Sequence, residues 1–499
     1  MQLVAYGAQD IYLTGNPQIT FFKVVYRRHT NFSMEVIEQT VNGTSTLTGS
    51  STSGTVTISR NGDLVGRIYV TSDTADITDG DELVSEVELE IGGQRIDKHY
   101  KEWNQIWAEL STPESKASAY KAMTGALSHG LNKTGTAGVN MVQVPLQFWF
   151  CRNPGLALPL IALQYHEVKL KFTWGTSTTV GAAAVCKVMV DYIYLDTDER
   201  RRFAQQSHEY LIEQLQRQNE AGTTSMKLNF NHPVKELIWT SDQNYTDAKL
   251  VLNGHDRFQK QQEEYFQLRQ PLDHHTAVPG ANIPMSDRLV FTTPVEIFNG
   301  LHNDTTAAVP GSATDGGQAI LTNSNITFHA NHIATGVSLG DFLKVGDVLK
   351  IELIDADAAA GTQGISQFVQ VSVVTSSTVV TFVAYEPHVS GTGLTSGILK
   401  ATDSAAMNPV DDDPLTIHLV ARLQEPVSRC SQLTDKVNVY SFALKPEEHQ
   451  PSGTCNFSRI DNAKLNFTAD PHSGTMNIYA VNYNVLRIMS GMGGLAYSN

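Results

Sequence analysis

VELEIGGQRI (residues 87–96) recurs later in the chain as the related stretch AKLVLNGHDRF (residues 248–258). The alignment places Leu89 on Leu250 at an offset of 161 residues, and an aromatic, Gln- and Glu-rich helical stretch follows both copies. Self-similarity at a fixed offset is the sequence signature of a repeated structural unit. The chain is therefore predicted to contain two copies of one fold.

A second internal match lies nearer the C-terminus. EVKLKFT (residues 167–173) resembles NAKLNFT (residues 462–468), with Leu170 on Leu465 at an offset of 295 residues. The two offsets differ by 134 residues, which predicts an insertion of about that length in the second copy. Residues 303–413 fit this insertion, because they are rich in Gly, Ala, Ser and Thr around the strand-like pieces GDVLKIELID, FVQVSVV and TVVTFVAY. We expect a small β-domain set into a loop; a long irregular loop is the alternative.

The rest of the pattern is typical of half-buried antiparallel strands. Apolar and polar residues alternate in four segments that end at turn formers, residues 54–62, 85–93, 167–174 and 187–196. Helical spacing occurs in KEWNQIWAEL (residues 101–110) and HEYLIEQLQRQ (residues 208–218), which we expect to be short helices lying on sheets. Two all-β units of about eight strands each predict two tandem eight-stranded jelly rolls, although strand number alone does not separate a jelly roll from another Greek-key sandwich.

The composition is that of an acidic protein. Charged residues make up 17% of the 499 residues and the formal net charge is −15, which argues against a body that binds nucleic acid non-specifically. No Cys-x-x-Cys pair occurs, so we expect reduced thiols and neither a zinc ribbon nor a disulfide scaffold. The four cysteines are Cys151, Cys186, Cys430 and Cys455.

No targeting segment is expected. The N-terminal MQLVAYGAQD lacks the basic region and the apolar core of a signal peptide. The apolar residues 144–165 are interrupted by Arg152, Pro154 and Pro159, so they are not expected to cross a bilayer as one helix.

Short patterns that suggest catalysis or metal binding have the wrong spacing. His274 and His275 are adjacent and would point to opposite faces of a strand. DADAAAG (residues 355–361) lacks the closing Glu of a calcium loop, and DDDP (residues 411–414) fits a solvated loop better than a cation site. GMGG (residues 491–494) has no helix after it, which excludes a dinucleotide-binding loop. We therefore expect no enzymatic activity, no metal and no cofactor.

Four blocks carry a family resemblance. They are YLTGNPQITFFKVVYRRHTNFSME (residues 12–35), LPLIALQYHEVKL (158–170), CNFSRIDNAKL (455–465) and NVLRIMSGMGGLAYSN (484–499). In this order, and at both termini, they strongly resemble the major capsid proteins of nucleocytoplasmic large DNA viruses. The resemblance implies two tandem jelly rolls in one chain, a homotrimer whose six jelly rolls form a pseudo-hexagonal capsomer, and capsomers that tile an icosahedral shell. Residues 303–413 carry no such resemblance.

The duplication and the resemblance together predict five segments. They are an N-terminal arm (1–30), the first jelly roll (31–215), the first part of the second jelly roll (216–302), the inserted β-rich surface domain (303–413), and the second part of the second jelly roll with the C-terminal segment (414–499). The implied partners are further copies of the chain, neighbouring capsomers, minor capsid and penton proteins and inner viral membrane proteins, without direct genome binding. The implied location is the virion shell, after synthesis and assembly in the host cytoplasm.

The first block is unusually apolar for a chain terminus. Full burial of a large apolar side chain is worth about 1.5–3 kcal/mol, so residues 19–26 should be buried somewhere. The resemblance implies an arm at the base of the capsomer, in which a turn, aromatic anchors and basic groups contact the underside of the jelly roll or a neighbour. The alternative is that residues 19–26 form the first strand. The assembly residues of the arm are then Asn16, Pro17, Phe21, Phe22, Tyr26, Arg27 and Arg28.

Two further sets of residues are candidates for surface roles. Arg200, Arg201 and Arg202 follow the last strand of the first copy and are predicted to contact another domain or capsomer; the alternative is a solvated linker paired with its own acidic neighbours. Asn303 and Asn325 are the most reachable of the N-x-S/T glycan acceptors, although we expect no host-type modification without a signal peptide.

A rival reading is a jelly-roll carbohydrate-binding protein or glycosidase. That class of protein needs a row of exposed aromatic residues or two facing carboxylates. The sequence singles out neither.

Overall fold

The computed structural model describes residues 7–24, 26–72, 77, 80–125, 142–180, 183–283, 289–302, 318–321, 325–328, 343, 345–354, 364–374, 379–384, 413–423 and 428–497. The chain divides into two compact units. Unit 1 comprises Met1–Pro279 and Ser428–Asn499, and unit 2 comprises Gly280–Val427.

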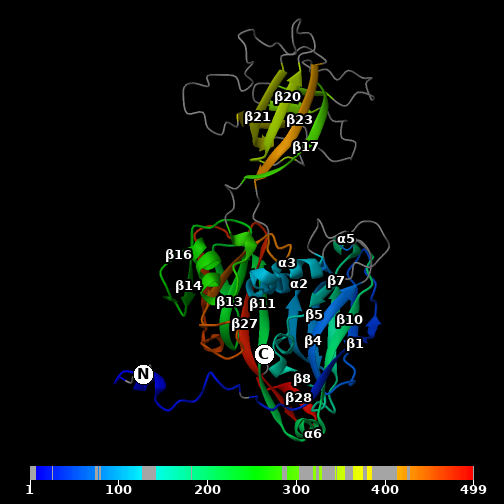
Figure 1. Cartoon of the computed structure of the whole chain (residues 1–499), viewed down its shortest axis with the longest axis vertical. Helices are drawn as coiled ribbons and strands as arrows, with labels where there is room; N and C mark the ends of the chain where they lie inside the picture. Colours follow the sequence, from blue (N-terminus) through cyan, green and yellow to red (C-terminus); the bar gives the residue numbers. More distant parts are fainter. Residues whose placement is uncertain are drawn as a thin grey trace, which may run out of the picture. The chain divides into compact units, whose positions relative to one another are not determined.

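The first half of unit 1 is a sandwich of two antiparallel sheets (Figure 1). Sheet 1a has the order β1-β10-β4-β7, with β8 on β4, and sheet 1b has the order β2-β3-β9-β5-β6. The strands are β1 Phe32–Gln39, β2 Val41–Gly43, β3 Ser53–Thr57, β4 Leu64–Ser72, β5 Val84–Ile91, β6 Gln94–Tyr100, β7 Val142–Pro145, β8 Leu158–Pro159, β9 Val168–Trp174 and β10 Lys187–Leu195. All four segments predicted from alternation are confirmed as strands, namely β3, β5, β9 and β10.

The second half of unit 1 is a second sandwich. Sheet 2a has the order β11-β27-β13-β24, with β25 on β13 and β28 on β27, and sheet 2b has the order β12-β26-β14-β15, with β16 on β14. The strands are β11 His208–Ala221, β12 Ser225–Leu228, β13 Pro233–Ser241, β14 Asp247–Leu252, β15 His255–Asp256, β16 Gln261–Gln262, β24 Lys436–Ser441, β25 Cys455–Asn456, β26 Ala463–Phe467, β27 Thr475–Met489 and β28 Met492–Leu495.

The two sandwiches are copies of one jelly roll, as the duplication predicts. In sheet 1a the first strand of the copy, β1, lies beside its last, β10, and β4 and β7 follow; in sheet 2a the first strand, β11, lies beside the last long strand, β27, and β13 and β24 follow. The register also repeats: Leu89 is opposite Leu170 in the first copy, and Leu250 is opposite Leu465 in the second. The turns at residues 92–93 and 253–254 have positive φ at both positions, which is the geometry of a tight β-hairpin.

Short helices connect the strands. They are α1 Ile11–Thr14, η1 Asp81–Leu83, α2 Lys101–Ser111, α3 Glu114–Met123, α4 Trp149–Arg152, η2 Pro154–Leu156, α5 Ser177–Val180, α6 Thr197–Gln205, η3 Tyr265–Arg269 (a π-helix), α7 Gln270–His274, η4 Gly280–Asn282 and η5 Phe457–Arg459. Helix α2 confirms the helix predicted at residues 101–110. Among the helices that the structure describes, none is long and apolar enough to span a membrane.

The helix predicted at residues 208–218 is wrong, because this segment lies within strand β11. All 14 residues of β11 pair with β27. Ile212 packs in the core of the first sandwich, whereas Leu215, three residues on, packs against α2 on the opposite face of the strand. Burial on both faces removes the simple alternation of a strand and produces spacings that imitate a helix. The first strand of the chain begins at Phe32, so the alternative that residues 19–26 form that strand is also wrong.

Unit 2 is a closed barrel with the strand order β17-β18-β19-β22-β21-β20-β23. Its strands are β17 Leu289–His302, β18 Gln318–Leu321, β19 Asn325–Phe328, β20 Val348–Ile354, β21 Gly364–Val374, β22 Val379–Ala384 and β23 Asp413–Leu423. The three strand-like pieces expected in the insertion are β20, β21 and β22. β17 precedes residue 303 and β23 continues beyond residue 413, so the barrel takes strands from both sides of the range 303–413. β17 and β23 pair with each other over most of their length.

Candidate functional site

The two sandwiches of unit 1 meet in an apolar junction. Helix α2 of the first sandwich presents Trp103, Ile106, Trp107 and Leu110, at the i, i+3, i+4, i+7 spacing of one helix face. They pack on the outer face of sheet 2a, against residues of β13, β24 and β27: Ile238, Val437, Val439, Tyr479 and Val481. Sheet 2a is therefore buried on both faces, which explains why eight of the nine residues of β13 are buried.

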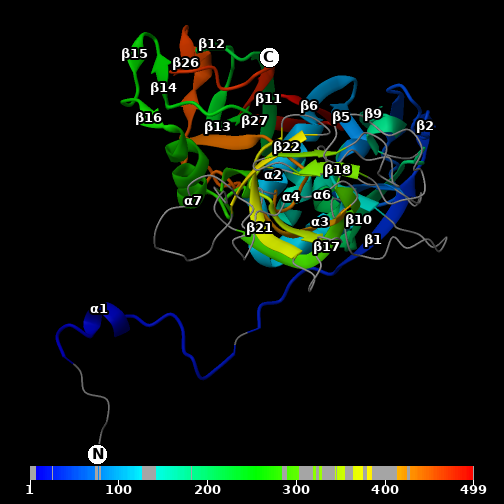
Figure 2. The same ribbon diagram turned by 90° about the horizontal axis from the view of Figure 1, so that it is seen from above.

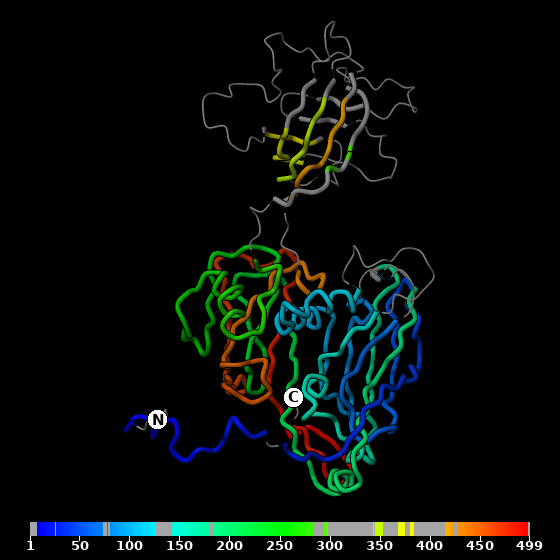
Figure 3. Tube along the Cα trace, in the orientation of Figure 1, coloured from blue at the N-terminus to red at the C-terminus, as the bar shows by residue number. Residues whose placement is uncertain are grey.

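The strand pair β11–β27 extends the junction into the first sandwich. Ile212, Leu486 and Ile488 belong to the hydrophobic core of that sandwich. Figure 3 shows the C-terminal end of the chain, in red, beside the blue and cyan strands of the first sandwich. The hairpin to β28 is held there by His166, whose Nδ1 lies 2.9 Å from the Gly493 carbonyl oxygen. GMGG thus runs from the hairpin turn at Gly491 into β28, and the contact with His166 ties this strand to the first sandwich.

A cluster of buried charges lies in the same junction. The Glu213 carboxylate on β11 is 3.0 Å from Arg152 Nη1 of α4 and 2.8 Å from Lys235 Nζ of β13. The side chain of Lys235 is 0% exposed. The Arg152 guanidinium lies over the Trp107 ring at 3.8 Å from its centroid. Burial alone would raise the pKa of Glu213, but the neighbouring cations and His449 outweigh it and lower the pKa to about 2.

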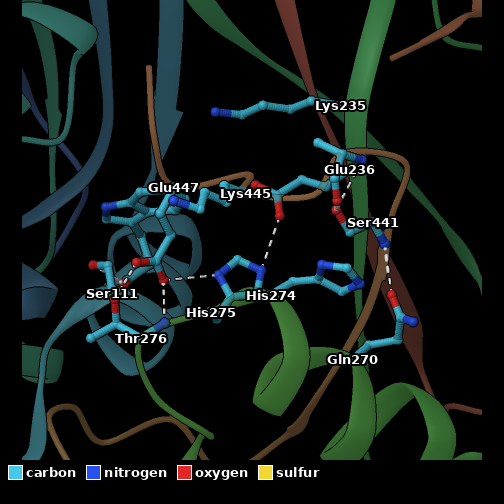
Figure 4. A network of polar contacts seen from close by, with 12 residues as sticks. Ser111, Lys235, Glu236, Gln270, His274, His275, Thr276, Ser441, Lys445 and Glu447 are labelled. Carbon is cyan, nitrogen blue, oxygen red and sulfur yellow. Dashed lines mark hydrogen bonds and ion pairs between the residues drawn. The ribbon is translucent and has the colours of Figure 1, made fainter. Parts of the chain in front are cut away.

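A second ionic group holds the loop that follows β24 (Figure 4). His275 Nε2 lies 3.1 Å from Glu236 and His275 Nδ1 lies 3.0 Å from Glu447. Thr276 donates its backbone N–H, at 2.9 Å, and its hydroxyl to Glu447. Burial disfavours the charged imidazole, but the two carboxylates outweigh it and raise the pKa of His275 to about 9. The imidazolium therefore bridges two carboxylates at neutral pH.

Glu109 of α2 anchors the chain where it re-enters unit 1. Its buried carboxylate accepts hydrogen bonds from the backbone N–H groups of Arg429, Cys430 and Ser431 at 3.1, 2.7 and 2.8 Å. Arg429 in turn donates to the Thr112 carbonyl at the end of the same helix, at 2.6 Å. This carboxylate fixes the return segment to the first sandwich.

These groups are suited to holding an orientation. Each buried charge faces an opposite charge or backbone donors, and a buried ion pair that loses one partner is strongly destabilised. Among the described residues, no group of three His, Cys, Asp or Glu side chains is arranged to hold a metal ion. The junction therefore locks the two jelly rolls into one body, and this is the arrangement in unit 1 with the clearest functional consequence.

The predicted arm residues are strongly exposed. Phe21, Phe22 and Tyr26 are 87, 98 and 87% exposed, and Asn16 has a positive φ of 50° just before Pro17. Arg27 and Arg28 are exposed as well. The structure thus brings none of these side chains into a core, and their contact with another molecule stays a prediction.

The other predicted surface residues fall in different places. Arg200, Arg201 and Arg202 are exposed on helix α6, which joins β10 of the first sandwich to β11 of the second, and Arg200 Nε pairs with Asp63 of the first sandwich at 3.0 Å. Their contacts with another copy stay a prediction. Asn325 begins β19, whereas Asn303 lies outside the described residues, as do residues 355–361 and the first two residues of DDDP. The last two residues of DDDP begin β23.

The sequence patterns did not identify the junction: they considered His275 only as a rejected metal ligand and Arg152 only as an interruption of an apolar stretch, and they did not single out Glu213, Lys235 or Glu447. These five residues are spread over almost 300 residues, and no motif joins them. One available signal was the pair Lys235-Glu236 inside the otherwise apolar stretch PVKELIWTS, because charges rarely occupy a buried strand without partners.

Comparisons with known proteins agree with this architecture. Residues 20–197 match the family model described as "Major capsid protein N-terminus", and residues 199–246 and 422–494 match that described as "Large eukaryotic DNA virus major capsid protein". The chain is 43% identical to the major capsid protein of Pyramimonas orientalis virus and 37% identical to that of Paramecium bursaria Chlorella virus 1, covering 100% of this chain and 99% of each relative. A solved PBCV-1 capsid structure is similar at a TM-score of 0.58 and 29% identity, over 96% of this chain and all of that one.

Proposed function

The chain belongs to the major capsid proteins of large eukaryotic DNA viruses, and from this premise we propose that three copies form a pseudo-hexagonal capsomer that tiles an icosahedral shell. The supporting observation is the pair of jelly rolls with one strand order, joined by the buried junction. Three such chains supply six similar sandwiches. Contacts that run head to tail close into a ring when the rotation between copies permits it.

The junction matters for this function because a capsomer needs its sides at fixed angles. A hinge between the two jelly rolls would let the ring open or close on other numbers of copies. The packing of α2 on sheet 2a and the charges around Glu213 remove that freedom. A permanent assembly of this kind generally buries more than about 2,000 Å² between subunits.

Measurement of the mass of the purified chain in solution tests the proposal. Light scattering coupled to size-exclusion chromatography should give three chain masses over a wide range of dilution, and electron microscopy should show particles with pseudo-sixfold outlines. A stable monomer at every concentration would contradict the proposal.

The N-terminal arm, residues 1–30, contacts a neighbouring copy or another shell component in this scheme. The support is the exposure of its apolar side chains together with the basic pair Arg27 and Arg28. Deletion of residues 1–30 should leave the trimer intact and abolish its assembly into larger lattices. Unchanged lattice formation by the shortened chain would argue against the arm.

The remaining partners follow from membership of the shell. Neighbouring capsomers, minor capsid and penton proteins and inner viral membrane proteins are the contacts proposed for the assembled virion, after assembly in the host cytoplasm. Unit 2 is proposed to carry surface contacts, because it forms a barrel with its own hydrophobic core. Removal of unit 2 should then leave the trimer unchanged and alter attachment to the host.

A further inference from the structure

The outer faces of the equivalent sheets 2a and 1a differ: a helix covers the first, and the second exposes apolar side chains. In sheet 2a, the outer face is covered by α2. In the equivalent sheet 1a, the edge strand β1 presents three apolar side chains to solvent at alternating positions. Phe32, Met34 and Val36 are 55, 59 and 61% exposed. Large exposed apolar side chains on a sheet edge mark an interaction surface; Glu38 and Asp191 lie on the same face beside them.

The register shows that these faces are equivalent. In sheet 2a, Ile238 is opposite Tyr479 on one side and Val439 on the other, and all three side chains pack under α2. At the matching place in sheet 1a, Tyr69 is opposite Met189 and Pro145, and all three are only half-buried. We call Phe32, Met34, Val36, Tyr69, Pro145 and Met189 the open face.

The second jelly roll carries the counterpart of α2. Its helix η3–α7 follows β14–β16, as α2 follows β5–β6, and presents Tyr265, Leu268 and Leu272 to one side. Leu272 is 71% exposed, and Tyr265 and Leu268 are partly exposed. These residues line a hollow of about 690 Å³ together with Lys260, Gln261, Gln262, Glu264 and Arg269. Phe266 belongs to the core of the second jelly roll, and Tyr265 packs against that core with part of its ring. We call Tyr265, Leu268 and Leu272 the open helix.

We propose that the open face of one copy packs on the open helix of a second copy, and so repeats between chains the contact that α2 makes with sheet 2a within the chain. β1 and α7 lie on opposite sides of unit 1 (Figures 1 and 2), so one molecule does not cover its own open face with its own open helix. The contact is therefore head to tail, and each copy offers one surface of each kind.

This inference rests on the proposed trimer and assigns the surfaces that close it. With two jelly rolls in each chain, a closed ring of three has six contacts of one kind: three within chains, through α2, and three between chains, through the open helix. One packing solution used six times explains why both surfaces expose large apolar side chains such as Met34 and Leu272.

The test places charges on each surface of the full-length chain. Met34→Glu with Val36→Glu alters the open face, and Leu272→Glu alters the open helix; all three side chains are solvent-exposed, so the far-UV circular dichroism spectrum should not change. Each variant should weaken trimerisation by about thirtyfold or more and elute as a monomer at concentrations where the unaltered chain is a trimer. Val383→Glu, at an exposed apolar position of the unit 2 barrel, is the matched control and should remain trimeric.

Mixing the two variants tests the head-to-tail geometry. The open-face variant keeps an intact open helix, and the open-helix variant keeps an intact open face, so an equimolar mixture forms one good contact and should give a one-to-one heterodimer by native mass spectrometry. Variants that stay trimeric beside a trimeric unaltered chain would overturn this contact and leave the proposed trimer standing. A monomeric unaltered chain would overturn both.

Discussion

Replacing Glu213 by Gln should strongly destabilise the fold. Glu213 is the common partner of Arg152 and Lys235, and the side chain of Lys235 is completely buried. The variant keeps the volume of the side chain and removes its charge, so Lys235 is left in the junction without an anion. Arg152 also loses the carboxylate that holds it over the Trp107 ring.

The size of the effect follows from the pKa of the carboxyl group. The pKa of Glu213 falls from 4.5 to about 2 on folding. One pKa unit corresponds to about 1.4 kcal/mol, so the folded protein favours the ionised carboxylate by about 3 kcal/mol. Loss of one partner from a buried ion pair typically costs about 3–5 kcal/mol, which agrees. We expect Glu213→Gln to lower the free energy of unfolding by about 3 kcal/mol at pH 7.

Urea unfolding followed by tryptophan fluorescence measures this loss, because Trp103 and Trp107 lie in the junction. The matched control is Glu209→Gln on the same strand: Glu209 pairs with Arg487 at 2.8 Å, but both side chains are more than half exposed, and such pairs contribute at most about 1 kcal/mol.

The pH dependence gives a second readout of the same carboxylate. The folded pKa of Glu213 lies below the unfolded value, so its contribution is complete above pH 4.5 and is lost as the pH falls towards 2. The difference between wild type and Glu213→Gln should shrink to less than about half by pH 3. Equal losses for Glu213→Gln and Glu209→Gln, or a difference that does not change between pH 7 and pH 3, would refute the reasoning.

Three further predictions concern the same body. His275→Gln should remove a contribution to the free energy of unfolding that is complete below pH 6.5 and is lost as the pH rises through about 9, because the pKa of His275 is raised on folding. Wild type and variant should therefore converge in urea stability above pH 9. Parallel pH profiles of the two proteins would contradict this. Trp103→Ala should cost about 3–5 kcal/mol in the same unfolding assay, since the ring is 1% exposed, and a loss below 1 kcal/mol would show that α2 does not hold the junction. Gly491→Ala should lower the thermal midpoint, because Gly491 has a φ of +82° and a Cβ there would lie 2.6 Å from the Tyr165 ring. The control Gly474→Ala, with its nearest contact at 3.8 Å, should leave the midpoint unchanged. Equal midpoints for the two variants would contradict the requirement for glycine at residue 491.

The sequence predicted many strands of unit 1, because a strand with one buried face alternates apolar and polar residues along a short segment. Alternation marked β3, β5, β9 and β10, and the offset between Leu89 and Leu250 identified strands that occupy the same place in two jelly rolls. The helix predicted at β11 is wrong. That strand is covered on both faces, by the core of the first jelly roll and by α2, and no local pattern of one strand reveals a cover contributed from elsewhere in the chain.

The sequence by itself determined the duplication, the class of fold and the family, since each of these is recorded in short stretches whose residues are neighbours along the chain. Only the tertiary structure decided how the two jelly rolls are joined. Arg152 and Lys235 each approach Glu213 to within 3.0 Å because three separate elements meet at one place, and a buried charge is stable only where all its partners are present together. The relative positions of these three side chains depend on how whole sheets pack, and no single segment of the sequence determines that packing.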